Sequence, residues 1–199
     1  YYDNQLYQKG ALVMSKKADL SALFGANDTS SFLGLETCDD LKLLSASLAL
    51  IGIPCATPYN SVGPYCKNAP NALRGAIASL SANIDRHNFD LDGRIFPKDH
   101  PRAVDCGDLP YDEDNFQANR ENIFKSIKTI LSKKSIPIVI GGDDSIPIPV
   151  LQAFEGKKKY TILQIDAHID WRKSHMGEVF GLSSTMRRAS EMDHIERII

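Results

Sequence analysis

Apolar residues along the chain fall into short continuous runs separated by polar or periodic stretches. The run at 48–53 is halted by Pro54 and is typical of a strand buried on both faces of a parallel sheet. Similar runs at 136–140 and 160–163 predict two further buried strands. Residues 102–108 predict a short strand that runs into a turn.

Three stretches of helical periodicity separate these strands, beginning near Pro70, Asp114 and Ser145. Proline suits a first helical turn, and serine is a favourable N-cap. The expected apolar faces are Leu73, Ile77 and Leu80 in the first helix, Phe116, Ile123, Phe124, Ile127, Ile130 and Leu131 in the second, and Ile148, Leu151 and Phe154 in the third. Strands and helices that alternate at short spacing predict an α/β domain with a mostly parallel sheet.

The two ends of the chain suggest how it is organised. Residues 1–45 contain Gly, Asn, Asp and Ser at irregular intervals, and these residues interrupt helices and strands. This predicts an N-terminal extension that wraps the core or reaches a neighbouring subunit. A partly mobile arm is an equal alternative. We expect residues 46–199 to form an incomplete α/β domain of a longer polypeptide, because the chain starts at Tyr1 rather than Met and stops inside an apolar segment.

Composition narrows the classes of protein. Hydrophobic residues make up 43% and charged residues 24% of the chain, which is ordinary for a globular domain. A net charge of -2 gives no electrostatic case for binding nucleic acid or an anionic membrane, and no apolar run approaches the length of a bilayer crossing. The four cysteines lack zinc-ribbon spacing, so we expect reduced thiols in a cytoplasmic protein, with a disulfide as the alternative.

Candidate metal ligands follow two of the predicted strands. Asp166, His168 and Asp170 occupy every second position after the apolar run at 160–163, so an extended chain points them to one side. Asp144 follows the strand predicted at 136–140. Ligands of open α/β sheets bind outside the carboxyl ends of the strands, so we expect these side chains to share one crevice.

The chemistry of this set favours a hard divalent cation. Carboxylates with one imidazole suit Mn²⁺ better than a structural zinc, and closely spaced carboxylates suit a pair of metals about 3.5 Å apart. Such a pair lowers the pKa of a water held between the ions, so that hydroxide is available near neutral pH. The plain structural alternative is a strand end capped by polar side chains.

The chain resembles the ureohydrolase (arginase/agmatinase) family, through Gly-Gly-Asp-x-Ser at 141–145 and Asp-Ala-His-x-Asp at 166–170. Further matches are Leu-Ile-Gly-Ile-Pro at 50–54, Ala-Pro-Asn-Ala-Leu-Arg at 69–74, Asp-Cys-Gly-Asp at 105–108 and the agmatinase-like Thr-Met-Arg-Arg-Ala at 185–189. The resemblance implies a three-layer α/β/α domain, assembly into homo-oligomers, and hydrolysis of a small guanidino compound to urea through a metal-bridging hydroxide. It also implies a binuclear Mn²⁺ centre, with Ni²⁺ or Co²⁺ as alternatives, in which Asp166 bridges the metals, His168 holds one and Asp170 the other.

The chain departs from the family pattern in ways that leave a second hypothesis open. Asp144 stands where the family usually has a histidine ligand, and either Leu182 or Ser183 stands at the family's proton-transfer histidine, depending on the alignment. His175 is a substitute or merely an exposed loop residue, so no catalytic base is assigned. The family's later Asp-x-Asp ligand pair is not found after the metal motif. A non-catalytic binding or regulatory protein of this fold is therefore the alternative, and a formiminoglutamate or amide hydrolase stays open within the enzyme class.

Overall fold

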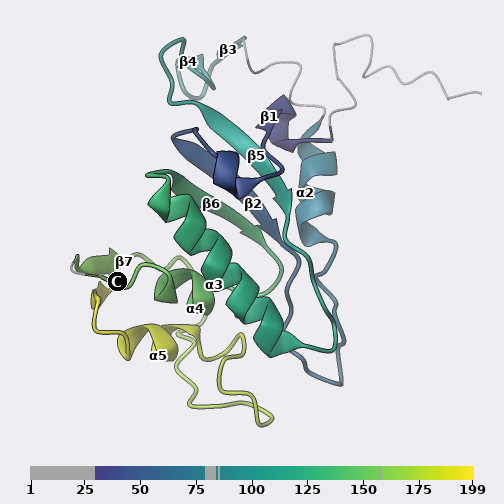
Figure 1. Ribbon diagram of the computed structural model, residues 1–199, viewed down its shortest axis with the longest axis vertical. Coiled ribbons are helices and arrows are strands. Elements are labelled where there is room, and N and C mark those ends of the chain that lie inside the picture. Colours follow the sequence, from purple (N-terminus) through teal and green to yellow (C-terminus); the bar gives the residue numbers. More distant parts are fainter. Residues whose placement is uncertain (1–29, 79–83, 85, 157) are drawn as a thin grey trace, which may run out of the picture.

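The computed structural model describes residues 30–78, 84, 86–156 and 158–199 (Figure 1). The helices are α2 (Ala69–Ile77), α3 (Phe116–Ser132), α4 (Pro147–Gln152) and α5 (Thr185–Ser190), with 3₁₀ turns η1 (Phe32–Gly34) and η2 (Leu41–Leu43). The strands are β1 (Glu36–Thr37), β2 (Leu48–Ile53), β3 (His87–Asn88), β4 (Gly93–Arg94), β5 (Ala103–Asp108), β6 (Ile136–Gly141), β7 (Tyr160–Ile162) and β8 (Ile195–Ile198).

A four-stranded parallel sheet with the order β1-β5-β2-β6 is the centre of the fold. Strand β2 lies inside it and pairs with β6 from Leu48 opposite Ile136 to Ile53 opposite Gly141. Strands β7 and β8 form a separate parallel pair, and β3 and β4 a small antiparallel one. The predicted α/β class with a mostly parallel sheet is confirmed.

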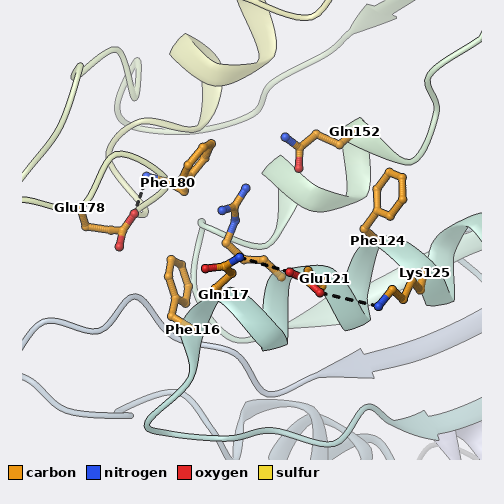
Figure 2. Close-up of a pocket in the computed structure, with 9 residues that line it drawn as sticks. Phe116, Gln117, Glu121, Phe124, Lys125, Gln152, Glu178 and Phe180 are labelled. Atoms are coloured by element: carbon orange, nitrogen blue, oxygen red, sulfur yellow. Dashed lines mark hydrogen bonds and ion pairs between the residues drawn. The ribbon is translucent and has the colours of Figure 1, made fainter.

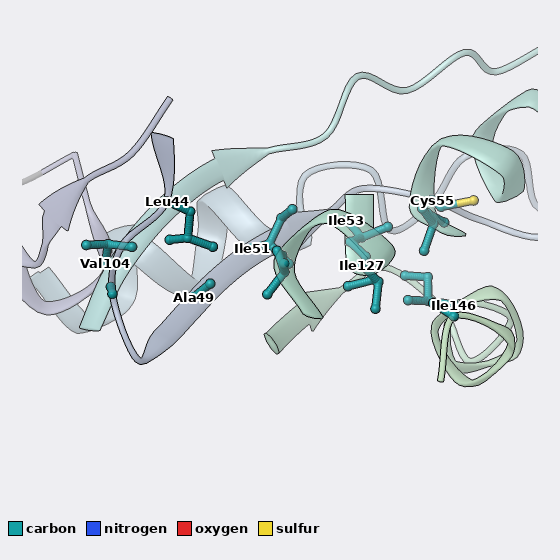
Figure 3. Packing of buried hydrophobic residues seen from close by; sticks show 12 residues of the cluster. Leu44, Ala49, Ile51, Ile53, Cys55, Val104, Ile127 and Ile146 are labelled. Carbon is teal, nitrogen blue, oxygen red and sulfur yellow. The ribbon is translucent and has the colours of Figure 1, made fainter. Parts of the chain in front are cut away.

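The alternation of side chains along β2 builds the layers on either side of the sheet. Ala49, Ile51 and Ile53 point to one face and pack in one cluster with α3, which lies across that face in Figure 1. Figure 3 shows Ile51 and Ile53 beside Ile127 of this helix. On the opposite face, a Cβ on Gly52 would lie 2.9 Å from the Pro70 side chain, so α2 covers that side closely.

Helix α3 follows the prediction well. Its first turn is capped by Asn115, whose side chain accepts a hydrogen bond of 3.0 Å from the backbone of Ala118. Ile123, Ile127 and Ile130 lie at helical spacing and are buried. Each contributes about 1.5–3 kcal/mol through the burial of its side chain, which fixes this helix against the sheet.

The predicted apolar face of α2 is wrong at Leu73, whereas Ile77 is half-buried. Leu73 is 45% exposed, Leu80 lies outside the described residues, and the buried positions of the helix are Pro70 and Arg74. Helical spacing marks which residues share a face but not which face meets the core. Here a charged residue, rather than a leucine, turns inward.

Arg74 is buried because it forms ion pairs with two aspartates of β5. Its Nε and Nη2 lie 2.7 and 2.8 Å from the two carboxylate oxygens of Asp105, and Nη1 pairs with Asp108. Asp105 also accepts a hydrogen bond of 2.8 Å from the backbone of Phe32. Burial raises the pKa of Asp105, but the hydrogen bonds from Arg74 and the backbone outweigh it and hold that pKa below its usual value.

Two strands predicted to be buried are partly exposed. Ile136 and Ile138 of β6 are 62% and 41% exposed, and Leu163 after β7 is 71% exposed. Among the described residues no strand pairs with the outer edge of β6, and β7 pairs only with β8. Burial depends on neighbours in space, so an apolar run alone cannot establish it.

The cysteines form no disulfide in the described structure: Cys38, Cys55, Cys66 and Cys106 are all free thiols. Burial is the main cause that raises the pKa of Cys55 to about 12, so this thiol stays protonated at neutral pH. Across the residues that the structure describes, no helix combines the length and apolar character that crossing a bilayer requires.

Candidate metal centre

Three carboxylates converge where β6 and β7 end. One carboxylate oxygen each from Asp144, Asp166 and Asp170 lies within 4.8 Å of the other two. Asp144 follows β6, whereas Asp166 and Asp170 follow β7, so the group joins the central sheet to the separate β7–β8 pair. Within the described part of the chain this is the only cluster of three such side chains close enough to hold one ion.

Two of the three carboxylates each have a buried oxygen without a hydrogen-bond partner. The Oδ2 atoms of Asp144 and Asp170 are shielded from solvent and accept no hydrogen bond. Burial, and next the neighbouring Asp170, raise the pKa of Asp144 to about 8. Buried, unpaired carboxylate oxygens are costly unless a cation or a proton neutralises them, so this donor set fits a hard divalent ion.

His168 lies beside this group rather than within it. Its side chain is 84% exposed, and its Nδ1 lies 3.8 Å from Oδ1 of Asp166. The backbone N–H of His168 donates to the same oxygen at 2.8 Å. The structure therefore brings together three of the four predicted ligands and leaves the imidazole adjacent to them.

The loop after β6 is fixed by Asp143. Its carboxylate accepts hydrogen bonds from the backbone of Thr57 at 2.6 Å and of Ser145 at 3.0 Å, and from the Ser145 hydroxyl at 2.5 Å. Ser145 was expected to cap the next helix, but its hydroxyl binds Asp143 and α4 begins only at Pro147, so that prediction is wrong. A Cβ on Gly142 would lie 1.9 Å from the carbonyl oxygen of Cys55, so only glycine fits where the two loops meet.

The loop after β7 has an unusual backbone at one ligand. Asp170 adopts a φ of 42°, in the left-handed region that aspartate tolerates better than most residues. Its carbonyl accepts a hydrogen bond of 3.2 Å from the backbone of Arg187 in α5. The position of Asp170 is therefore set both by its own turn and by that helix.

A cavity of about 820 Å³ is lined by one of the three carboxylates, that of Asp170. Its lining includes Tyr59, His168, Asp170, Trp171, Arg172 and His175. His175 packs edge-on against Tyr59 with ring centroids 5.3 Å apart, and its Nδ1 lies 3.0 Å from Nη1 of Arg172. Leu182 and Ser183, the alternative positions predicted from the sequence to match the family's histidine, also line this cavity.

A second cavity, of about 690 Å³, lies between α3, α4 and the segment 178–180 (Figure 2). The guanidinium of Arg120 stacks 3.6 Å from the centre of the Phe180 ring, and Glu121 pairs with Lys125 on the wall of the cavity. No metal-binding group of three ligands lies among its described residues. The first cavity is therefore the better candidate for chemistry.

The contacts of three residues around the site were not anticipated from the sequence. Asp143, Thr57 and Thr185 hold the loops through hydrogen bonds to backbone groups. The Asp-x-Ser spacing at 143–145 is a turn signal that could have identified Asp143. The threonines bond to positions 125 and 41 residues away, which leaves no local pattern.

The parallel sheet, the helices on both of its faces and the carboxylate cluster beyond the carboxyl ends of β6 and β7 define an α/β protein with a candidate cation site. The sequence profile of the Arginase family matches residues 46–199. The chain belongs to this family. The predicted ureohydrolase resemblance and the arginase-like fold are thereby confirmed.

Individual relatives agree with this placement. An agmatinase of Bacillus subtilis (strain 168) is 34% identical over 153 residues, which cover 74% of this chain and 48% of the relative. A guanidinobutyrase of Pseudomonas aeruginosa is 31% identical over 180 residues, which cover 86% of this chain and 54% of the relative. The crystal structure of formimidoylglutamase from Bacillus subtilis superposes with a TM-score of 0.64 at 22% identity, covering 96% of this chain and 54% of that one. The chain thus spans about half the length of the curated relatives it matches.

Proposed function

We propose that the chain is part of a metal-dependent amidino hydrolase that cleaves a C–N bond of a small guanidino compound and releases urea, as an agmatinase does. The carboxylate group of Asp144, Asp166 and Asp170, with its two unpartnered buried oxygens, is the observation that carries the proposal. Similarity to an agmatinase and a guanidinobutyrase supports this class of substrate. We also propose that the protein assembles as a homo-oligomer, as the family resemblance implies.

The residues that would hold the metal are those predicted from the sequence. Asp144, Asp166 and Asp170 offer carboxylate oxygens, and His168 is the adjacent imidazole. Mn²⁺ in a binuclear centre is our first candidate, with Ni²⁺ and Co²⁺ as alternatives, because hard oxygen donors dominate. Such ions, when bound, supply Lewis-acid chemistry that activates water and polarises the group under attack.

The cavity beside the carboxylates suits a planar cation. The faces of aromatic rings attract guanidinium groups, and Tyr59 and Trp171 both line the cavity. Asp170 adds a carboxylate to the same lining, which also contains Arg172 and His175. A guanidinium bound in this cavity would therefore lie close to Asp170 and His168, two of the candidate metal ligands.

The test is urea release after metal exchange. The protein is dialysed against chelator, reloaded with Mn²⁺, Ni²⁺ or Co²⁺, and assayed with agmatine, 4-guanidinobutyrate and arginine. We expect metal-dependent urea from at least one compound, its loss in Asp166→Asn, and its retention in the control Asp90→Asn, which replaces an exposed aspartate of the β3–β4 turn. Absence of urea with every metal and compound contradicts the enzyme proposal.

A second candidate function is favoured by Leu182 and Ser183 at the cavity wall, since neither side chain is a proton-transfer base at neutral pH. On this hypothesis the protein binds metal and a guanidino ligand without turnover. Calorimetric binding of Mn²⁺ and of a guanidino compound, together with no urea from the same sample, would support it. Urea production excludes it.

A further inference from the structure

Helix α5 reaches both loops that carry the candidate ligands. The Thr185 hydroxyl in its first turn donates to the carbonyl oxygen of Asp144. Two residues further on, the backbone N–H of Arg187 donates to the carbonyl of Asp170 at 3.2 Å. One rigid element therefore holds the main chain at a ligand after β6 and at a ligand after β7.

A second threonine links the same region to the loop after β2. The backbone N–H of Thr57 donates to Asp143 at 2.6 Å, and its hydroxyl accepts from the N–H of Leu182 at 3.0 Å. Thr57 and Thr185 are only 1% and 0% exposed. These bonds are thus shielded from water, and no solvent molecule can replace a lost hydroxyl without rearrangement.

We propose that Thr185 and Thr57 are positioning residues that set the separation between Asp144 and Asp170 before a cation binds. The two carboxylates come from different sheets, so no strand pairing fixes their distance. The Oδ2 atoms of both side chains have no hydrogen-bond partner, so no hydrogen bond made by these oxygens fixes the distance either. The Thr185 hydroxyl holds the main chain at Asp144 against α5, which also bonds to Asp170, and Thr57 links the adjoining loops at Asp143 and Leu182. This inference rests on the proposed cation site.

The key variant is Thr185→Val, which keeps the shape of the side chain and removes the hydroxyl. Thr185→Ser keeps the hydroxyl and serves as the conservative rescue. The matched control is Thr129→Val in α3, because that hydroxyl donates to the carbonyl of Lys125 at 2.9 Å, far from the site in sequence and in another element. Each protein is titrated with Mn²⁺ by calorimetry after removal of metal, and its unfolding by urea is followed by circular dichroism.

Outer-shell partners of metal ligands typically change metal affinity by about 10–100-fold when removed. We expect a loss of this size in Thr185→Val, and a change below about threefold in Thr185→Ser and Thr129→Val. A merely structural role would lower the unfolding midpoint of Thr185→Val and leave its Mn²⁺ affinity as in the unmodified protein, which overturns the proposal.

Three further outcomes are decisive. If Thr185→Val does not fold, Thr57→Val is measured in the same way, and an unchanged Mn²⁺ affinity in that variant overturns the proposal. If the unmodified protein binds Mn²⁺ but releases no urea, the positioning role is still judged by the affinities and only the enzymatic activity fails. If it binds no divalent ion, the positioning role and the proposed function fall together.

Discussion

Replacing Asp144 with asparagine should stabilise the metal-free protein at neutral and alkaline pH while weakening its binding of divalent cations. The carboxamide of asparagine has nearly the same size and shape as the carboxylate, so the main change is the loss of one negative charge. Once Asp144 ionises in the metal-free protein, that charge lies beside Asp166 and Asp170 with no cation to offset it. The substitution therefore separates the destabilising effect of the clustered carboxylates in the metal-free protein from their contribution to cation binding.

The magnitude follows from the separation of the carboxylates. At 4.8 Å, the upper limit within the group, two unit charges repel by about 3.5 kcal/mol at an effective dielectric constant of about 20. Asp166 is partly exposed, so solvent screens its share. We expect the asparagine variant to gain about 2 kcal/mol in free energy of unfolding when Asp144 would be ionised.

The gain depends on pH in a defined direction. Burial, followed by Asp170, raises the pKa of Asp144 from 3.8 to about 8 in the folded protein. The protonated carboxyl therefore stabilises the folded state fully below pH 3.8, and this stabilisation is lost as the pH rises through 8. Asparagine cannot ionise, so the gain in free energy of unfolding of the variant over the unmodified protein should widen between pH 3.8 and about 8 and level off at higher pH.

The assay is urea unfolding in the presence of chelator at pH 5, 7 and 9, followed by calorimetric titration with Mn²⁺. The exposed Asp99 provides a control, since Asp99→Asn removes the same charge away from the site. Equal pH dependence in the Asp144→Asn and unmodified proteins would refute the reasoning. So would a variant that loses stability at pH 9.

Three other substitutions test the framework that positions the site. Arg74→Met leaves Asp105 buried without its cation, and chemical unfolding should show a loss of about 3–5 kcal/mol, whereas a loss below about 1 kcal/mol contradicts the buried ion pair. Ile127→Ala should cost about 2–5 kcal/mol in the same assay, because the side chain is fully buried between α3 and the sheet. Gly142→Ala should cost about 1–3 kcal/mol, since its new methyl group meets a backbone carbonyl, and thermal unfolding at or above the unmodified midpoint would contradict the close approach.

The sequence was sufficient for the elements whose pattern is long or continuous. The run at 48–53 and the periodic stretch of α3 lie as predicted, because each buries a side-chain pattern that belongs to one kind of element. The inward turn of Arg74 was not predictable, since its partner Asp105 is 31 residues away. The exposure of Ile136 likewise depends on which strands lie beside β6.

The candidate site, too, was predictable only where a local sequence pattern determines the arrangement. The convergence of Asp144 with Asp166 and Asp170 could be expected from strand ends in a parallel fold. The sequence did not reveal that β6 and β7 lie in different sheets, so the loops rather than one sheet bring the carboxylates together. It also did not reveal Thr185, because a hydroxyl that binds a distant backbone carbonyl has no periodic signature.

The left-handed backbone at Asp170 limits which mutations this position can accept. A residue here has to tolerate a φ of 42° and also present a carboxylate to the group. Asparagine adopts this backbone readily but is neutral, and glycine adopts it but has no donor atom. Glutamate keeps the charge on a longer side chain and adopts this backbone conformation less readily. Position 170 is thus doubly constrained, and aspartate meets both demands at the lowest conformational cost.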